Sequence, residues 1–309
     1  YTGFCGRGDK SRKGAMATVL GRDMLTVEEA PVFIVPGCEY GQGSGFEGHE
    51  FFEAPSIRKI GDTYYFVYSS VVMHELCYAV SKSPTSGFVY GGVLVSNCDL
   101  HIDTYKPADR PMAYGANNHG GMVNIRGDWY IFYHRHTNGT WYSRQGCAEK
   151  IEILPDGRIP QAELTSCGLN GGPLEGRGEY PAYIACNLFR DIPSVYVGDS
   201  RFPKIMQDGR DGDEEPGYIG NIQDSVTAGF KYFDCRGVRE IRIRVRGYAD
   251  GVFEVKTAWD GKILGAVKVN YSNVWEEYSA PVNIPDGIQA IYLTYRGGGN
   301  ASLLSFSLL

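Results

Sequence analysis

The chain has 309 residues, a formal net charge of −6, 41 glycines, 22 tyrosines and 43% hydrophobic residues. A chain of this length has room for two domains, and its short Val/Ile/Tyr runs between glycines favour β-structure over a helical bundle. The 30 basic residues form no cluster, so no nucleic-acid partner is predicted. Apolar stretches such as residues 32–35 are far too short to cross a bilayer, so no membrane partner is predicted either.

The beginning of the chain and its cysteines say little about the cellular compartment. No basic and then apolar leader follows Tyr1, which leaves a cytoplasmic and a secreted, bacterial-type protein both open. The eight cysteines include no Cys-x-x-Cys pair, which excludes zinc-ribbon and thioredoxin-type motifs. Disulfides are permitted by the even number, but free buried thiols are the favoured interpretation in a chain with its own core.

An internal repeat organises the first half of the chain. After strand-like runs at residues 14–20 and 32–35, residues 53–69 align with residues 119–134 at an offset of 66, which closes to 65 after Asp62. Each copy contains a short strand, a Gly-Asp turn and an aromatic second strand. Two further strand-like runs follow each copy: residues 74–82 and 88–96 in the first, and residues 146–154 and 157–164 in the second. Four strands in about 65 residues are typical of a propeller blade.

Glu53 and His119 occupy the same place in the two copies, eight residues before the turn glycine. Because the first strands of successive blades run along the central axis of a propeller, both side chains are expected to point at one funnel. The apolar neighbours Phe51, Phe52 and Pro55 would shield the Glu53 carboxyl from water. The alternative is that each is an isolated polar residue at the end of a strand.

The pattern changes after Phe189. Residues 208–217 are predicted to be a solvated linker rather than a calcium loop, because the EF-hand spacing and its final glutamate are absent. From residue 229 onward, strand-like runs without helical periodicity predict a β-sandwich. These runs are residues 230–233, 240–245, 252–258, 262–269, 276–282, 290–295 and 303–308. The predicted fold class is all-β, with a propeller portion over residues 1–186 and a linker and sandwich over residues 187–309.

Two stretches of the sequence resemble known families. Phe51-Phe-Glu-Ala-Pro-Ser-Ile-Arg-Lys59, with residues 64–69, Asn118-His-Gly and residues 129–134, resembles the five-bladed propellers of glycoside hydrolase family 43, over about residues 1–186. Residues 229–309 resemble a family 6 carbohydrate-binding module, a jelly-roll sandwich. The resemblance implies an inverting hydrolase that releases arabinofuranosyl or xylosyl units from plant polysaccharides or oligosaccharides and requires no cofactor.

The resemblance also implies roles for individual residues. Glu53 corresponds to the general acid of the family, and an inverting glycosidase needs such an acid together with a carboxylate base about 6.5 to 9.5 Å away. His119 corresponds to an inner-strand histidine beneath the sugar site, a substrate-binding position that often meets a structural calcium. We expect any such ion to be held largely through water, because calcium prefers oxygen ligands.

Four further residues are candidates for substrate contact: His74 at the rim of the funnel, Tyr68 and Trp141 as stacking aromatics, and Arg144, which by resemblance lines the sugar pocket. The alternatives stay open. They are a loop histidine without a chemical role, core packing of the two aromatic rings, and a surface ion pair of the arginine. His134 and His136 alternate on one strand, but no third ligand stands at a fitting spacing, so a metal site there is not favoured.

In the sandwich, Tyr218, Trp259 and Trp275 could form a sugar platform, with core packing as the alternative for Trp275. The family's module often holds a calcium through an aspartate near the last strand. Residues 301–305 contain no aspartate, so that calcium is not predicted.

The family has a catalytic base and a second aspartate that tunes the acid, and the resemblance gives neither of them a counterpart in this chain. The family carries both ahead of the segment that matches residues 1–3. Only about two and a half blades are recognised, whereas propellers close with four to eight. We therefore expect an N-terminal segment or a second chain to complete the propeller. The alternative function is a non-catalytic carbohydrate-binding fragment, inactive because both aspartates are missing.

Overall fold

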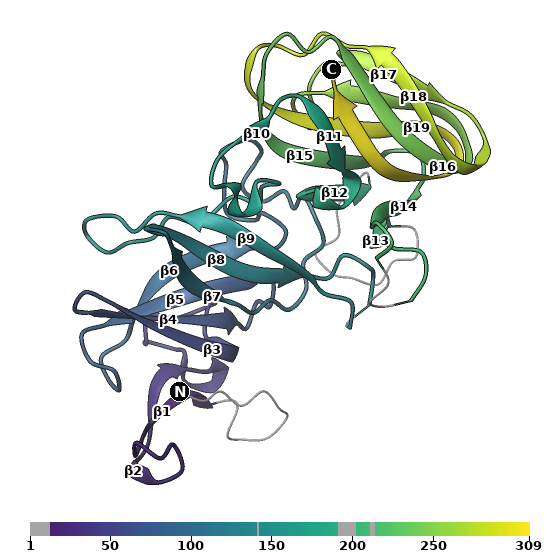
Figure 1. Ribbon diagram of the computed structural model, residues 1–309. Helices are drawn as coiled ribbons and strands as arrows, with labels where there is room; N and C mark the ends of the chain where they lie inside the picture. Colours follow the sequence, from purple (N-terminus) through teal and green to yellow (C-terminus); the bar gives the residue numbers. More distant parts are fainter. Residues whose placement is uncertain (1–12, 141, 191–201, 211–213) are drawn as a thin grey trace. The chain divides into compact units, whose positions relative to one another are not determined.

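The computed structural model describes residues 13–140, 142–190, 202–210 and 214–309, and strands predominate in all four ranges (Figure 1). The chain divides into two compact units. The first comprises residues 1–97, 115–135 and 146–163, and the second comprises residues 98–114, 136–145 and 164–309. In the described ranges, no helix is long and apolar enough to cross a membrane. The predicted all-β class is confirmed, whereas the domain boundary at residue 186 stays a prediction.

The sheets of the first half are antiparallel and built from consecutive strands. They are β1 (Gly14–Leu20) with β2 (Val27–Pro36), then β3 (Phe51–Ile60), β4 (Thr63–Ser70), β5 (Glu75–Ser81) and β6 (Val89–Ser96), and finally β7 (Gly121–Ile125), β8 (Asp128–Arg135) and β9 (Gln145–Ile151). Gly61 and Gly127 lie in the turns between the two strands of each repeat hairpin and have positive φ, which explains why glycine stands at both turns. These sheets agree with blades of the predicted propeller.

The fourth strand of the second repeat, predicted over residues 157–164, does not form. Pro160 lacks the N–H that a ladder needs, and the segment is held by single contacts instead. Tyr65 donates its hydroxyl to the Gly157 carbonyl at 3.0 Å, and the Ile159 N–H donates to the Tyr78 hydroxyl at 2.9 Å. The second repeat therefore has three strands.

An apolar surface remains on the two-stranded sheet of β1 and β2. On β2, Val27 is 57% exposed and Phe33 52%, and no third strand pairs with this sheet among the described residues; Leu25, in the connection between the two strands, is 85% exposed. Such an edge fits the expectation that further chain completes the propeller. The number of blades and the source of the missing ones stay predictions.

The second unit contains the sandwich. Its strands are β10 (Leu174–Glu175), β11 (Gly178–Pro181), β12 (Asn187–Arg190), β13 (Lys204–Met206), β14 (Tyr218–Ile222), β15 (Val226–Cys235), β16 (Glu240–Lys256), β17 (Gly265–Val269), β18 (Ser272–Pro281) and β19 (Gly287–Leu308). Its core includes the fully buried rings of Phe230, Phe233 and Phe306. Short 3-10 helices lie at Cys38–Tyr40, Gly168–Asn170 and Ala182–Ile184.

Two pairs of predicted strands are continuous in the structure. The runs at 240–245 and 252–258 form most of β16, and the runs at 290–295 and 303–308 lie in β19. The two long strands pair from Ile241 with Leu308 to Lys256 with Tyr292. Glycines make this continuity possible, since a Cβ on Gly299 would lie 1.5 Å from the Tyr248 carbonyl oxygen. The sequence analysis predicted the runs on either side as separate strands, whereas the two backbones approach closely at this glycine.

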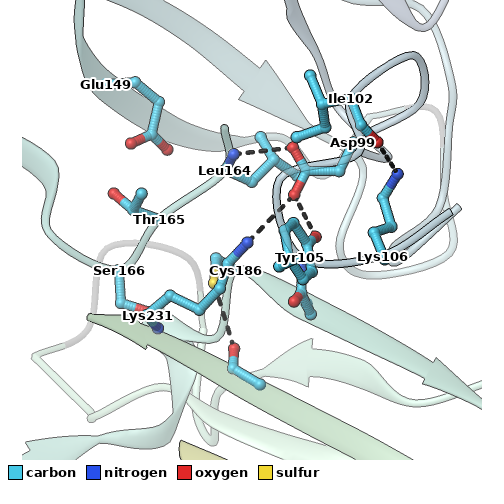
Figure 2. Close-up of polar contacts among 12 residues, drawn as sticks. Asp99, Ile102, Tyr105, Lys106, Glu149, Leu164, Thr165, Ser166, Cys186 and Lys231 are labelled. Carbon is cyan, nitrogen blue, oxygen red and sulfur yellow. Dashed lines mark hydrogen bonds and ion pairs between the residues drawn. The ribbon is translucent and has the colours of Figure 1, made fainter. Parts of the chain in front are cut away.

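A buried ion pair lies in the second unit, on the segment of residues 98–114 (Figure 2). Asp99 accepts hydrogen bonds from the Leu164 N–H at 2.8 Å and from the Tyr105 hydroxyl at 2.5 Å. The Lys231 ammonium on β15 lies 3.4 Å from the same carboxylate and 3.4 Å from the centre of the Tyr105 ring. This network fastens the segment to the sandwich.

The structure also bears on the cysteines. Cys77, Cys98, Cys186 and Cys235 are buried free thiols, and Cys38 is an exposed one. No disulfide joins the cysteines within the described ranges. The interpretation as free buried thiols is confirmed for these four residues.

Candidate functional site

Glu53 lies in an irregular part of β3. The register of β3 against β4 shifts on both sides of this residue, between Phe51 and Glu53 and between Glu53 and Ser56. Ala54 has a φ of 59°, a conformation that is strained for a residue with a Cβ. Such bulges re-aim a side chain out of the regular alternation of a strand. The half-buried Glu53 carboxyl is therefore directed by a special local backbone rather than by ordinary pleating.

Asn117 is the described side chain that binds the Glu53 carboxyl. Its amide Nδ2 donates to Glu53 Oε1 at 3.5 Å, a long hydrogen bond of the kind that tightens when a substrate binds. Both residues belong to the first unit. Sequence reasoning missed Asn117, although it stands only two residues before His119, the position that the repeat aligned with Glu53.

His119 contacts a second histidine. Its Nδ1 lies 2.8 Å from Nε2 of His134 on β8, so one ring donates to the other. The two rings meet edge to face at 4.3 Å. His119 is exposed, whereas His134 is 7% exposed. His136 is not part of this pair, because its Nδ1 lies 2.9 Å from the Thr140 carbonyl oxygen.

The residue that follows His119 has no room for a side chain, which explains why it is a glycine, Gly120. A Cβ at this position would lie 1.7 Å from the carbonyl oxygen of Phe132, a backbone atom of β8. At Gly121, a Cβ would lie 2.7 Å from Ser56 Oγ on β3. These close approaches bring β7 beside both neighbouring strands and so position the segment that carries Asn117 and His119.

A calcium ion near His119 stays a prediction. Calcium takes six to eight oxygen ligands, whereas the observed hydrogen bond joins His119 to the imidazole nitrogen of His134. The observed pair instead suits hydrogen bonding to a hydroxyl-rich ligand, and no step of the chemistry below passes through calcium.

Two of the predicted substrate-binding residues are buried. Tyr68 is completely buried against Phe51 and Phe66, and its hydroxyl donates to the His49 carbonyl at 2.7 Å. Burial raises its pKa well above the usual tyrosine value. Its ring is covered by the core, as the core-packing alternative expects, and the stacking role stays a prediction. His74 is 4% exposed, with Nδ1 3.0 Å from Ser96 Oγ, so it is not a free rim histidine.

Arg144 lies in the second unit, where its exposed side chain lines a hollow of about 790 Å³. Tyr142, Tyr183 and Glu214 line the same hollow. This setting is compatible with the predicted contact to a sugar. Trp141, the other predicted stacking residue of this region, lies outside the described residues.

The aromatic pair of the sandwich holds an arginine. The rings of Tyr218 and Trp275 meet edge to face at 5.3 Å, and the Arg246 guanidinium lies 4.3 Å from the Trp275 ring centre and 4.9 Å from that of Tyr218. Asp208 binds this guanidinium at 2.8 Å, so it is not merely part of a solvated linker. The guanidinium therefore lies close to both rings, and Trp275 is only half-buried. Trp259 similarly has a guanidinium, that of Arg110, 4.1 Å from its ring centre.

The fold and the site together define an all-β protein in which a bulged strand presents a carboxylate beside an amide and a histidine pair. No family model matches the chain. It is 70% identical over its whole length to a protein named xylosidase/arabinosidase from Thermoclostridium stercorarium, of which it spans 66%. It is 23% identical over 95% of its length to an arabinoxylan arabinofuranohydrolase from Paenibacillus polymyxa, of which it spans 44%.

The chain is therefore a homologue of proteins named xylosidase/arabinosidase and arabinoxylan arabinofuranohydrolase, and it spans less than two thirds of the length of each. Among solved structures, it matches a family 43 arabinoxylan arabinofuranohydrolase from Bacillus subtilis at 19% identity and a TM-score of 0.45, over 98% of this chain and 61% of that one. It also matches the module CsCBM6-3 from Clostridium stercorarium at 17% identity and a TM-score of 0.37, over 45% of this chain and 97% of that one.

Proposed function

We propose that this chain carries the general acid of a glycoside hydrolase that releases arabinofuranosyl or xylosyl units from plant polysaccharides or oligosaccharides. Glu53 is that acid. The names of the homologues support the reaction class. The observation that carries the proposal is the placement of Glu53 on a strained bulge with Asn117 bound to one of its oxygens.

The hydrogen bond from Asn117 suits an acid role. Because the amide donates to Oε1, that oxygen acts as the acceptor and the acidic proton resides on Oε2. As the glycosidic bond breaks, Glu53 transfers this proton to the departing oxygen and becomes a carboxylate. Asn117 keeps its donor on the same oxygen throughout, so it positions the acid without exchanging protons.

Inversion requires a second carboxylate that activates water on the opposite face of the sugar. We assign this base and the aspartate that tunes the acid to residues outside this chain, as the resemblance implies. His119 and Arg144 are proposed to bind sugar hydroxyls, the first backed by His134 and the second on its own hollow. The arabinose- or xylose-containing glycan is the proposed partner.

The dependence of the rate on the leaving group tests the role of Glu53. In the full-length protein, we expect Glu53→Gln to lower kcat/KM on arabino- or xylo-oligosaccharides by about 10²- to 10⁴-fold. The loss should nearly vanish on dinitrophenyl glycosides, because that leaving group departs without a proton. Asn124→Gln, on an exposed position of β7, is the matched control and should leave both rates unchanged. An equal loss on both substrate types would refute the acid assignment.

The alternative function, a non-catalytic carbohydrate-binding chain, predicts a different result. It requires retention of the chain on arabinoxylan with no hydrolysis by the full-length protein. The sandwich aromatics give it little support, because Arg246 lies against both Tyr218 and Trp275. Binding without turnover in the same assays would nevertheless favour it over the hydrolase.

A further inference from the structure

Three side chains with metal-binding atoms lie close together in the first unit, and none of them takes part in the hydrogen bond between Asn117 and Glu53. His49 Nδ1 lies 2.9 Å from Glu75 Oε2, Glu75 Oε2 lies 3.6 Å from Cys77 Sγ, and Cys77 Sγ lies 4.0 Å from His49 Nδ1. His49 precedes β3, whereas Glu75 and Cys77 stand two residues apart on β5. Residues two apart on a strand point to the same face, so the fold itself brings these atoms together.

The separations lie around those of one face of a tetrahedral zinc site. Zinc binds imidazole nitrogen and carboxylate oxygen at about 2.0 to 2.2 Å and thiolate sulfur at about 2.3 Å, so tetrahedral ligands lie about 3.3 to 3.6 Å apart. Of the three observed separations, 3.6 Å lies in this range, 2.9 Å is shorter and 4.0 Å is longer, so rotations of the side chains must bring the other two into it. Histidine, glutamate and cysteine are also ligand types that zinc takes together.

The neighbours hold the ligands in place. The Tyr90 ring stacks on the His49 imidazole at 5.0 Å with an interplanar angle of 11°, and Ser70 donates its hydroxyl to Glu75 Oε2 at 3.0 Å. Contacts of this kind around a site orient its ligands. The side chain of Glu75 is completely buried and that of His49 is 30% exposed, so His49 is the ligand that solvent reaches.

We propose that His49, Glu75 and Cys77 bind a zinc ion, with a water molecule at the fourth position. On binding, the Cys77 thiol releases its proton to solvent and its sulfur bonds to the metal as a thiolate. The Nδ1 proton that His49 donates to Glu75 is also given up, to solvent or to Nε2 of the same ring, so that the Nδ1 lone pair and the Glu75 carboxylate both bond to the ion in place of their hydrogen bond. It ties the segment before β3 to β5, which makes its role structural and independent of whether Glu53 is a general acid.

Cobalt is the probe, because Co²⁺ takes zinc's place in such sites and reports a thiolate ligand by a sulfur-to-metal charge-transfer band in the near ultraviolet. We expect the metal-free 309-residue chain to bind one equivalent of Co²⁺ with this band and to release it when Zn²⁺ is added. Calorimetric titration with Zn²⁺ should give the same stoichiometry. Absence of stoichiometric binding would overturn the proposal and leave a hydrogen-bonded His–Glu pair.

Variants assign the ligands. Cys77→Ser should abolish the charge-transfer band, and His49→Gln should weaken Zn²⁺ binding by at least about tenfold while the far-ultraviolet spectrum stays unchanged. The exposed Cys38 supplies the matched control, because Cys38→Ser should retain the band and the affinity. A band that persists in Cys77→Ser, or that disappears in Cys38→Ser, would place the metal elsewhere and overturn the assignment.

Discussion

The Lys231 ammonium lies 3.4 Å from the Asp99 carboxylate, and the two side chains are 1% and 0% exposed (Figure 2). They are separated by 132 positions in the sequence. Removing both charges from water is costly, and the hydrogen bonds from Leu164 and Tyr105 to Asp99 offset part of that cost. The pair therefore fixes one arrangement of residues 98–114 on β15, since any other would leave a charge buried alone.

Breaking this pair on one side should be strongly destabilising. We expect Lys231→Met to lower the free energy of unfolding of the second unit by about 3 to 5 kcal/mol, because Asp99 is left buried without its cation. The double variant Asp99→Asn, Lys231→Met is the control and should recover a large part of the loss. Urea unfolding of the three proteins measures this, and a loss below about 1 kcal/mol in Lys231→Met would show that the pair is not sealed from water.

Asn117 should act on the acid without being a proton donor itself. We expect Asn117→Ala to reduce kcat/KM on oligosaccharides by about tenfold in the full-length protein, the equivalent of one hydrogen bond of about 1.4 kcal/mol. On dinitrophenyl glycosides, the same variant should be close to wild type, because that leaving group departs without a proton. If Asn117→Asp restored the rate on oligosaccharides, Asn117 would have only a packing role, because an ionised aspartate has no donor for Glu53.

Gly120 should tolerate no side chain. The Cβ of Gly120→Ala would collide with the Phe132 carbonyl, so the backbones of β7 and β8 must separate at a cost of about 1 to 3 kcal/mol. Gly146→Ala on β9 is the matched control, because no atom lies within 4 Å of its Cβ position. Thermal unfolding of both variants checks this expectation. Equal melting temperatures would mean that the approach of β7 to β8 is looser than the structure shows.

The ion pair of Asp208 with Arg246 predicts a small pH dependence of the second unit. The hydrogen bond from Arg246 lowers the pKa of Asp208 from its ordinary value of 3.8, against a smaller opposing effect of burial. Its stabilisation is therefore complete above pH 3.8 and is lost as the pH falls through the lowered pKa.

Because the Asp208 side chain is 46% exposed, we expect this contribution to stay below about 1 kcal/mol. Melting curves between pH 2 and pH 6 should show it in the wild type and in Arg242→Gln, a control on the same strand, but not in Arg246→Gln. An unchanged acid limb in Arg246→Gln would assign the pH dependence to other carboxylates.

The alternation of apolar residues and the positions of turn glycines were sufficient to predict most of the strands. These signals are local, so the repeat around Gly61 and Gly127 and the all-β class could be predicted before any contact was known. The same repeat singled out Glu53 and His119, although Glu53 lies within β3 and His119 lies two residues before β7.

Only the tertiary structure decided which distant residues meet. Asn117 binds Glu53 across 64 positions, and Tyr68 is covered on all sides by the core. The Arg246 guanidinium lies 4.3 Å from the centre of the Trp275 ring, and β16 and β19 each join two runs that the sequence analysis predicted as separate strands. A sequence pattern shows that a residue is apolar, charged or flexible, but the partner that covers or pairs with it is set by packing between segments far apart in the chain.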